Sequence, residues 1–256
     1  MKFKSLILIS LTVLILAACT LNKNLNLIPA DTKWEIAENY YNKGKYLKAA
    51  PYYEQLVLER NSIYTAEAQY KLADSYFLAG KYLDAVAEFQ LLISLFPDYK
   101  QNSTAQYKIG VAYYYYSPNP HYTQIETVKA IDAFHLFLDK YPRDENREDA
   151  YKYLEKCQKK LIEKAYLAGY IYYKIDDYSS ALMYFDEVIE LGNHDKLELN
   201  SLFYSAKIHY YRQDIDKLYQ TQEILREYFP DSKELKKIIK KTKILNKKMS
   251  KIKQKP

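Results

Sequence analysis

Residues 44–49 read Gly44-Lys45-Tyr46-Leu47-Lys48-Ala49, and 36 residues later the chain repeats them almost unchanged as Gly80-Lys81-Tyr82-Leu83-Asp84-Ala85. A fixed period of this size is typical of stacked helical hairpins. The sequence therefore predicts an all-α solenoid, a fold that offers extended surfaces to partners and seldom performs chemistry.

The same register extends through most of the chain. A small residue recurs in the first helix expected of each hairpin, and an alanine followed four residues later by an aromatic recurs in the second. Proline closes three units, because it cannot continue a helix. The small residues are Ala37, Ala73, Gly110, Gly169 and Ala206; the alanines are Ala49, Ala85, Ala130 and Ala181; the aromatics are Tyr53, Phe89, Phe134 and Phe185; and the prolines are Pro97, Pro142 and Pro230. These residues resemble the tetratricopeptide repeat, so we expect a right-handed solenoid of about five hairpins over residues 30–230.

Two irregularities interrupt the period. The third unit is longer than its neighbours, and the excess falls at residues 117–121, where two prolines predict a loop between the paired helices. Apolar residues then recur at spacings of three and four over residues 148–174, which predicts one long helix that joins the third and fourth repeats.

The N-terminus indicates an exported protein. Two lysines precede an apolar run at residues 6–16, which is shorter than the roughly 20 residues needed to span a bilayer but suits a signal peptide. The run ends in Leu16-Ala17-Ala18-Cys19, which resembles a bacterial lipobox. We therefore expect a lipoprotein signal peptide at residues 1–18, acylation of Cys19 and a tether at residues 19–29. A plain signal peptide with an incidental cysteine is the alternative.

The likeness to a lipobox also bears on location. Acylated Cys19 would attach the chain to a membrane by a lipid anchor, and the next residue is Thr20 rather than the aspartate that favours the inner membrane in enteric bacteria. We expect an outer-membrane protein whose body faces the periplasm.

The C-terminal segment, residues 231–256, is strongly basic. Residues 233–256 contain eleven lysines and one glutamate, in a chain with a formal net charge of +6. Apolar residues at helical spacing predict a capping helix that packs on the last repeat. Contact with anionic headgroups or with an acidic partner is the alternative. Nucleic acid is not an expected partner, because the signal peptide would export the chain.

The sequence contains no recognisable catalytic constellation. Its four histidines are scattered, it has five glycines and no glycine-rich phosphate loop, and it lacks a metalloprotease or hydrolase motif. We expect no enzyme activity, cofactor or metal. The second cysteine, Cys157, lies on an apolar helix face, where a buried structural thiol is expected.

Aromatic residues occupy two positions in the first helix of every repeat. The first position holds Trp34, Tyr70, Tyr107, Tyr166 and Phe203, and the second, seven residues later, holds Tyr41, Phe77, Tyr114, Tyr173 and Tyr210. Two helical turns separate the positions, so both lie on one stripe. We expect those of the first three repeats to contact peptides and those of the last two to dock a partner. Packing between neighbouring helices is the alternative, since the chain has 30 tyrosines.

The whole pattern resembles the BamD family of outer-membrane assembly lipoproteins. The resemblance rests on the lipobox, the five repeats, the long linking helix and the stretches Tyr113-Tyr114-Tyr115-Tyr116-Ser117-Pro118 and Phe137-Leu138-Asp139-Lys140-Tyr141-Pro142. It implies a periplasmic scaffold of the β-barrel assembly machinery that binds unfolded outer-membrane β-barrel proteins and a BamA-like POTRA-barrel protein. The alternatives are another tetratricopeptide lipoprotein, such as a pilus secretin pilot protein, and a ligand-binding lipoprotein.

Overall fold

The computed structural model describes residues 25–60 and 63–253, with side chains to residue 250. This part of the chain is all-α, as the repeat pattern predicts, and contains eleven helices and no strand. They are α2 (Ala30–Asn42), α3 (Tyr46–Leu58), α4 (Thr65–Leu78), α5 (Tyr82–Leu95), α6 (Asn102–Tyr116), α7 (Ile125–Lys140), α8 (Arg147–Lys174), α9 (Tyr178–Glu190), α10 (Lys196–Arg212), α11 (Ile215–Tyr228) and α12 (Lys233–Lys253). The expected signal peptide, the expected acylation of Cys19 and most of the tether fall outside the described residues.

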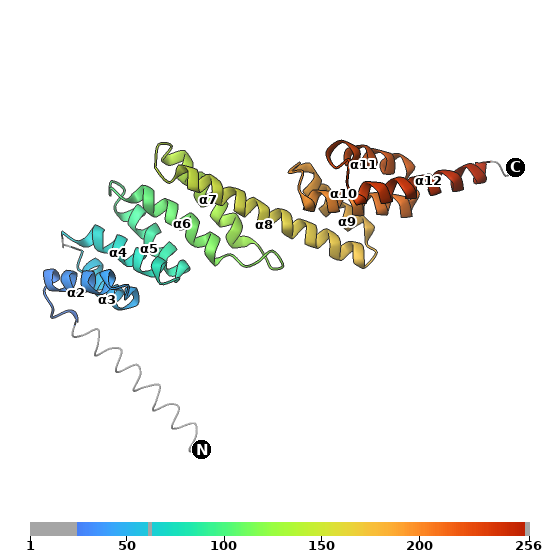
Figure 1. The fold of residues 1–256 in the computed structure, drawn as a ribbon. Helices are drawn as coiled ribbons and strands as arrows, with labels where there is room; N and C mark the ends of the chain where they lie inside the picture. Colours follow the sequence, from blue (N-terminus) through green and yellow to red (C-terminus); the bar gives the residue numbers. More distant parts are fainter. Residues whose placement is uncertain (1–24, 61–62, 254–256) are drawn as a thin grey trace, which may run out of the picture. The chain divides into compact units, whose positions relative to one another are not determined.

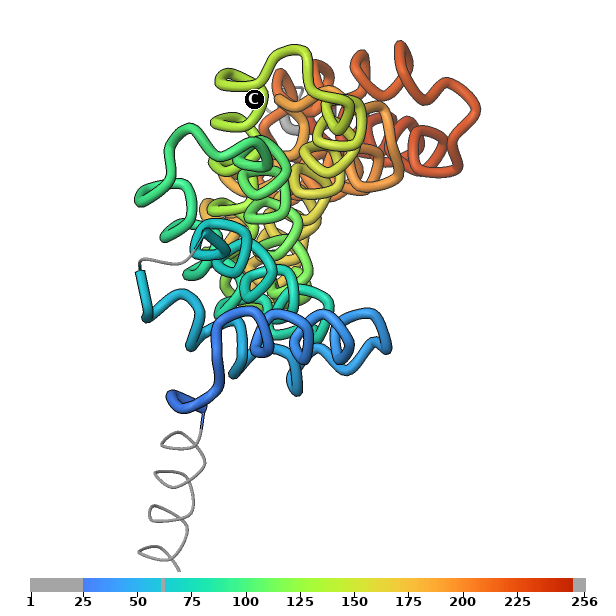
Figure 2. Tube along the Cα trace, turned by 90° about the vertical axis from the view of Figure 1, so that its left-hand side faces the viewer, coloured from blue at the N-terminus to red at the C-terminus, as the bar shows by residue number. Residues whose placement is uncertain are grey.

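The helices form two compact units. The N-terminal unit comprises the described residues up to 117 together with residues 125–154, and the C-terminal unit comprises residues 118–124 and those from 155 onward. In the N-terminal unit each helix from α2 to α7 packs against the next in chain order (Figure 1; Figure 2). In the C-terminal unit α10 packs against α9, α11 and α12, and α12 also packs against α11.

The repeated hexapeptides form identical turns. Gly44 and Gly80 adopt positive φ angles of 69° and 73°, a conformation that glycine reaches without a steric penalty. The next residue then donates its backbone N–H to a carbonyl five residues earlier, from Lys45 to Tyr40 at 2.9 Å and from Lys81 to Tyr76 at 2.8 Å. This hydrogen bond closes the first helix and redirects the chain into the second. The copied sequence therefore encodes the hairpin turn.

The last two hairpins make the same turn without glycine. Asp176 and Gln213 occupy the positive-φ position, with φ of 62° and 58°. Asp177 and Asp214 follow them, and their side chains accept the backbone N–H groups of Ser180 and Lys217 at the start of the next helix. These aspartates therefore act as N-terminal caps of α9 and α11.

The paired helices meet at the predicted small residues. A Cβ atom added to Gly110 would lie 2.7 Å from Cε1 of Phe134, and one added to Gly169 would lie 2.8 Å from the ring of Phe185. Both rings are fully buried. The alanines and aromatics at the equivalent positions are also buried, namely Ala37, Ala49, Tyr53, Ala73, Ala85, Phe89, Ala130, Ala181 and Ala206. Each of the first four hairpins is thus held by a ring that packs against a residue with little or no side chain, whereas the fifth has Gln222 at the position of the ring.

The two sequence irregularities also take the expected form. Residues 117–124 connect α6 to α7, and the side-chain amide of Gln124 donates to the backbone carbonyl of Asn119 at 2.8 Å. The long helix expected over residues 148–174 is α8, which begins one residue earlier. Cys157 is buried within it, as expected.

The C-terminal helix α12 covers the last hairpin. Leu235, Ile238 and Leu245 of α12 are buried in one cluster with Leu218 and Leu225 of α11. The side-chain hydroxyl of Thr242 donates to the amide oxygen of Gln222 at 3.0 Å, within the same interface. This arrangement agrees with the predicted capping helix.

Candidate protein-binding surface

The aromatic residues at the first stripe position, which we term the inner set, point toward the paired helix. In each of the first four hairpins the inner ring lies near the aromatic that recurs in the second helix, with ring centroids 5.7 to 6.2 Å apart. The pairs are Trp34–Tyr53, Tyr70–Phe89, Tyr107–Phe134 and Tyr166–Phe185. Phe203 packs against the cluster beneath α12. The inner set therefore contributes chiefly to packing.

Tyr70 illustrates the inner set. Only 6% of its surface is exposed, and its ring also lies 6.1 Å from that of Tyr99. Tyr107 is half-buried, and burial together with the nearby charge of Asp149 raises its pKa to about 12. Truncation of these side chains would open cavities in the hairpins.

At the second stripe position, which we term the outer set, a lysine lies over the ring more often than at the first, where, among the described residues, only Tyr70 and Phe203 have one. In four of five repeats the outer ring is half-buried, and a lysine ammonium lies over its face. The distances from lysine Nζ to the ring centroid are 4.2 Å for Lys71 on Tyr41, 5.5 Å for Lys108 on Phe77, 4.8 Å for Lys207 on Tyr173 and 4.4 Å for Lys241 on Tyr210. Such cation–π contacts contribute about 0.5–1 kcal/mol at exposed sites. The outer set thus presents partly exposed rings beside positive charges.

Tyr114 is the exception in the outer set. Its ring lies 5.1 Å from Tyr153 of α8 and 5.5 Å from Tyr115, so that aromatic neighbours surround it. The hydroxyl groups of Tyr115 and Tyr153 are 3.2 Å apart. Repeat three therefore presents a tyrosine cluster where the others present a ring beneath a lysine.

A chain of charges joins α2, α4 and α6 beside the outer set. Asp74 of α4 is buried, accepts a hydrogen bond from the hydroxyl of Tyr41 in α2, and pairs with Lys108 of α6. Lys71 lies 3.2 Å from Glu38. Glu38 also accepts a hydrogen bond of 2.5 Å from the hydroxyl of Tyr53. Three successive first helices are thus connected through alternating charges.

Burial and these carboxylates fix the protonation of the tyrosines. Burial, reinforced by the hydrogen bond to Asp74, raises the pKa of Tyr41 above its ordinary value. Burial and Glu38 do the same for Tyr53. Both hydroxyl groups therefore stay protonated as donors at neutral pH, and they hold the carboxylates in place.

Sequence reasoning identified the rings but missed the charges beside them. Lys71 and Lys108 are 37 residues apart, the same separation as Ala73 and Gly110. A comparison of charged positions in the repeat register would have found this pair. The repeat register could not have located the lysines of α12 that lie over Tyr210 and Phe203, because α12 is outside the repeats.

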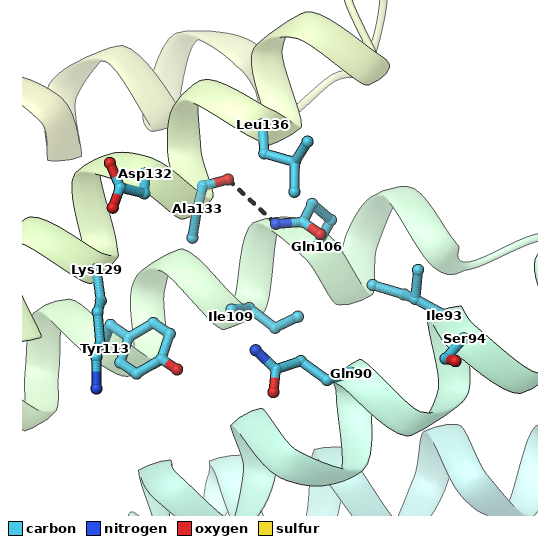
Figure 3. Close-up of a pocket in the computed structure, with 10 residues that line it drawn as sticks. All are labelled: Gln90, Ile93, Ser94, Gln106, Ile109, Tyr113, Lys129, Asp132, Ala133 and Leu136. Atoms are coloured by element: carbon cyan, nitrogen blue, oxygen red, sulfur yellow. Dashed lines mark hydrogen bonds between the residues drawn. The ribbon is translucent and has the colours of Figure 1, made fainter.

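Two hollows lie between successive second helices of the N-terminal unit. One, of about 390 Å³, is bounded by α5, α6 and α7, and Figure 3 shows its lining. At its floor the side-chain amide of Gln106 donates to the backbone carbonyl of Ala133 at 3.2 Å, drawn as a dashed line (Figure 3). The other hollow, of about 470 Å³, is bounded by α3, α4 and α5. There Gln69 donates in the same way to the carbonyl of Glu88 at 3.1 Å.

Candidate metal ligands do not gather in the part of the chain that the structure describes. No group of three or more histidine, cysteine, aspartate or glutamate side chains there is placed to hold a metal ion. Burial raises the pKa of the Cys157 thiol to about 11, which keeps it protonated at neutral pH.

Comparison with known proteins identifies the repeat. Residues 35–100, which span α3, α4, α5 and most of α2, match the family model described as tetratricopeptide repeat. Over this stretch, about a quarter of its length, the chain is similar to tetratricopeptide repeats. No curated protein matches it. Solenoids of this kind present extended concave surfaces to their partners.

Several solved structures show similarity to the chain at low sequence identity. The TPR2AB-domain:pHSP90 complex of yeast Sti1 has 16% sequence identity and a TM-score of 0.44, with 87% of this chain and 86% of that chain covered. A tetratricopeptide repeat protein from Parabacteroides merdae has 15% identity and a TM-score of 0.36, with 87% and 75% covered. PilW, a widely conserved type IV pilus biogenesis factor, has 15% identity and a TM-score of 0.35, with 82% and 98% covered.

No helix within residues 25–60 and 63–253 combines the length and the apolar character that crossing a bilayer needs.

Proposed function

We propose that the protein is a lipid-anchored scaffold of outer-membrane β-barrel assembly, held by acylated Cys19 and facing the periplasm. In this role it binds unfolded β-barrel proteins and a BamA-like POTRA-barrel partner. The observation that carries the binding role is the outer aromatic set, in which half-buried rings stand beside lysines on the first helices. The resemblance to BamD supports the pathway, through the lipobox, the loop at residues 117–124 and the long helix α8.

The chemistry of the N-terminal rings suits a barrel strand. Transmembrane strands alternate apolar and polar residues, and aromatic residues form girdles at the edges of the barrel. Tyr41 and Phe77 offer partly exposed rings to apolar side chains of an extended peptide, while Lys71 and Lys108 lie over one face of these rings and are themselves paired with Glu38 and Asp74. Rigid aromatic contacts have a low entropic cost, which favours recognition of many related sequences.

A peptide titration tests this assignment. Changing both Tyr41 and Phe77 to leucine keeps apolar bulk but removes the rings, and should weaken binding of a barrel C-terminal peptide by roughly tenfold, because aromatic contacts contribute about 0.5–1.5 kcal/mol each. Tyr116→Leu, an exposed ring of α6 outside the outer set, is the matched control. Tyr70 is unsuitable for the test, since it is buried and its truncation would disturb the fold.

Circular dichroism must accompany the titration, because Tyr41 also bonds to Asp74. A folded double variant with unchanged peptide affinity would refute the assignment. Association with the BamA-like partner should survive the change, since that contact is assigned to the rings of the C-terminal unit. Variants of Tyr173 and Tyr210 should have the opposite effect, with loss of the partner and retention of the peptide.

A pull-down tests the pathway. The tagged protein, recovered from detergent-solubilised outer membranes, should retain a POTRA-barrel protein. Recovery of a pilus secretin instead would replace the proposal by the pilot-protein alternative.

A separate fractionation tests the anchor. Cys19→Ser should shift the chain from the membrane fraction to soluble or uncleaved forms, because stable anchoring depends on the acyl chains. A fully processed Cys19→Ser protein that remained membrane-bound after a high-salt wash, in the absence of its partner, would contradict the anchor, because salt weakens any purely electrostatic contact.

A further inference from the structure

Four lysines of α12 form a stripe that the repeat fold does not require. Their spacings of four, three and four residues place them on one side of the helix. That side is opposite Leu235, Ile238 and Leu245, which are buried against α10 and α11. All four side chains are exposed, and we term them the lysine stripe: Lys236, Lys240, Lys243 and Lys247.

The lysine stripe lacks counter-charges of its own. Among the described residues, none of its members forms an ion pair or a side-chain hydrogen bond. Its neighbours on the helix differ, since Lys237 and Lys241 lie over the rings of Phe203 and Tyr210. With a rise of about 1.5 Å per residue, the stripe places four like charges along roughly 16 Å of helix. Their mutual repulsion favours an external anionic partner.

The composition of the segment favours a lipid surface over a protein. Residues 233–256 contain eleven lysines and no arginine. Protein interfaces enrich arginine, whose planar group binds carboxylates through two hydrogen bonds, and deplete lysine. Lysine is a hydrated point charge that suits the diffuse attraction of a headgroup layer. A straight stripe on a helix also matches a planar array of phosphates better than it matches a single acidic pocket.

An aliphatic side chain accompanies the charges. Ile244 follows Lys240 by one helical turn and precedes Lys247 by another, and it is 51% exposed. Helices that lie on membranes combine basic residues with apolar side chains that enter the boundary between headgroups and acyl chains. Ile244 is positioned to make that contact while the buried face of α12 stays on α10 and α11.

We propose that α12 binds the surface of an anionic phospholipid bilayer through the lysine stripe and Ile244. This contact would be a second attachment to the membrane, additional to the proposed lipid on Cys19. This proposal rests on the proposed function in one respect, because the lipid anchor would hold α12 at a high local concentration of headgroups. The contact itself needs neither a barrel substrate nor the BamA-like partner, so its failure and that of the proposed function can be told apart.

Vesicle sedimentation tests the proposal with the full chain in a Cys19→Ser background, so that no acyl group masks the result. The probes are vesicles of phosphatidylglycerol with phosphatidylcholine, and vesicles of phosphatidylcholine alone. The chain should bind the anionic vesicles more tightly, and salt should weaken that binding. Changing the lysine stripe to glutamine should reduce affinity by roughly fivefold per lysine. Changing it to arginine should preserve the affinity.

A matched control removes the same charge elsewhere. Glutamine at four exposed lysines of the N-terminal unit, namely Lys43, Lys45, Lys48 and Lys81, should leave vesicle binding nearly unchanged. Equal losses for the control and the stripe variant would overturn the proposal, because net charge alone would then explain the binding. So would equal affinity for both kinds of vesicle.

A further experiment tests whether the lysine stripe binds an acidic protein instead of a lipid surface. If polyglutamate binds the chain through the stripe while anionic vesicles do not, the partner is an acidic protein and the lipid assignment is wrong. Circular dichroism of each variant shows whether α12 remains folded. Glutamine and lysine have similar helix propensities, so helix content should not change.

Discussion

Replacing Gly110 by alanine should destabilise the N-terminal unit, although alanine is the better helix former. The added Cβ would lie 2.7 to 2.9 Å from three ring carbons of Phe134, well inside ordinary van der Waals contact at 3.4–4 Å. Phe134 is fully buried, and its ring is stacked on Tyr153 with centroids 5.4 Å apart. The ring therefore cannot move away without disturbing a second contact.

Two opposing effects determine the magnitude. An extra methyl group in a packed core costs about 1–3 kcal/mol, whereas glycine to alanine in a helix interior gains about 1 kcal/mol. We expect a net loss of up to about 2 kcal/mol in the free energy of unfolding. Because the two effects partly cancel, the contact is best isolated by a double-mutant cycle with Phe134→Leu, in which the smaller side chain makes room for the methyl group.

Urea unfolding followed by circular dichroism measures the cycle. The double variant should be more stable than the sum of the single changes implies, by about 1 kcal/mol or more. The Ala87→Gly change, at an exposed position of α5, measures the contribution of helix propensity to stability without a change in core packing. A Gly110→Ala protein that gains about 1 kcal/mol, with effects additive with those of Phe134→Leu, would show that the helices are not in close contact.

Three further outcomes follow from the electrostatics and burial. The pKa of Tyr107 is raised from 10.0 to about 12. The stability that its neutral hydroxyl contributes should therefore be complete below pH 10 and be lost as the pH rises toward 12. Titration of every tyrosine near pH 10 in the folded protein would contradict this prediction. In a Cys19→Ser background, Cys157 should react with a thiol reagent at neutral pH only after unfolding, and rapid labelling of folded protein would show that it is accessible. Asp74→Asn should cost about 1–3 kcal/mol, because Lys108 loses its charged partner; an unchanged urea midpoint would show that this pair contributes nothing to stability.

The hairpins could be predicted because each local sequence encodes its own turn and its own contact. Gly44 and Gly80 specify the turn, and the small residues specify where the second helix approaches. The roles of the two aromatic positions could not be separated in this way, since seven residues return to the same side of a helix. Tyr70 is buried and Tyr41 is half-exposed because of what the adjacent helices place beside them. Contacts of that kind depend on residues far apart in the chain.

The glutamines at the floors of the two hollows join the first helix of a hairpin to the second helix of the same hairpin through the main chain. Gln69 and Gln106 both bond to a backbone carbonyl, and the residue that supplies it is a glutamate in one hairpin and an alanine in the other. The bond to the carbonyl does not use that side chain, but Gln69 also donates to the carboxylate of Glu88 at 2.6 Å, and Ala133 is itself buried in the core. The link within each hairpin therefore depends on the glutamine of the first helix, and exposed positions of the second helix such as Leu91 and Leu136 can change without breaking it.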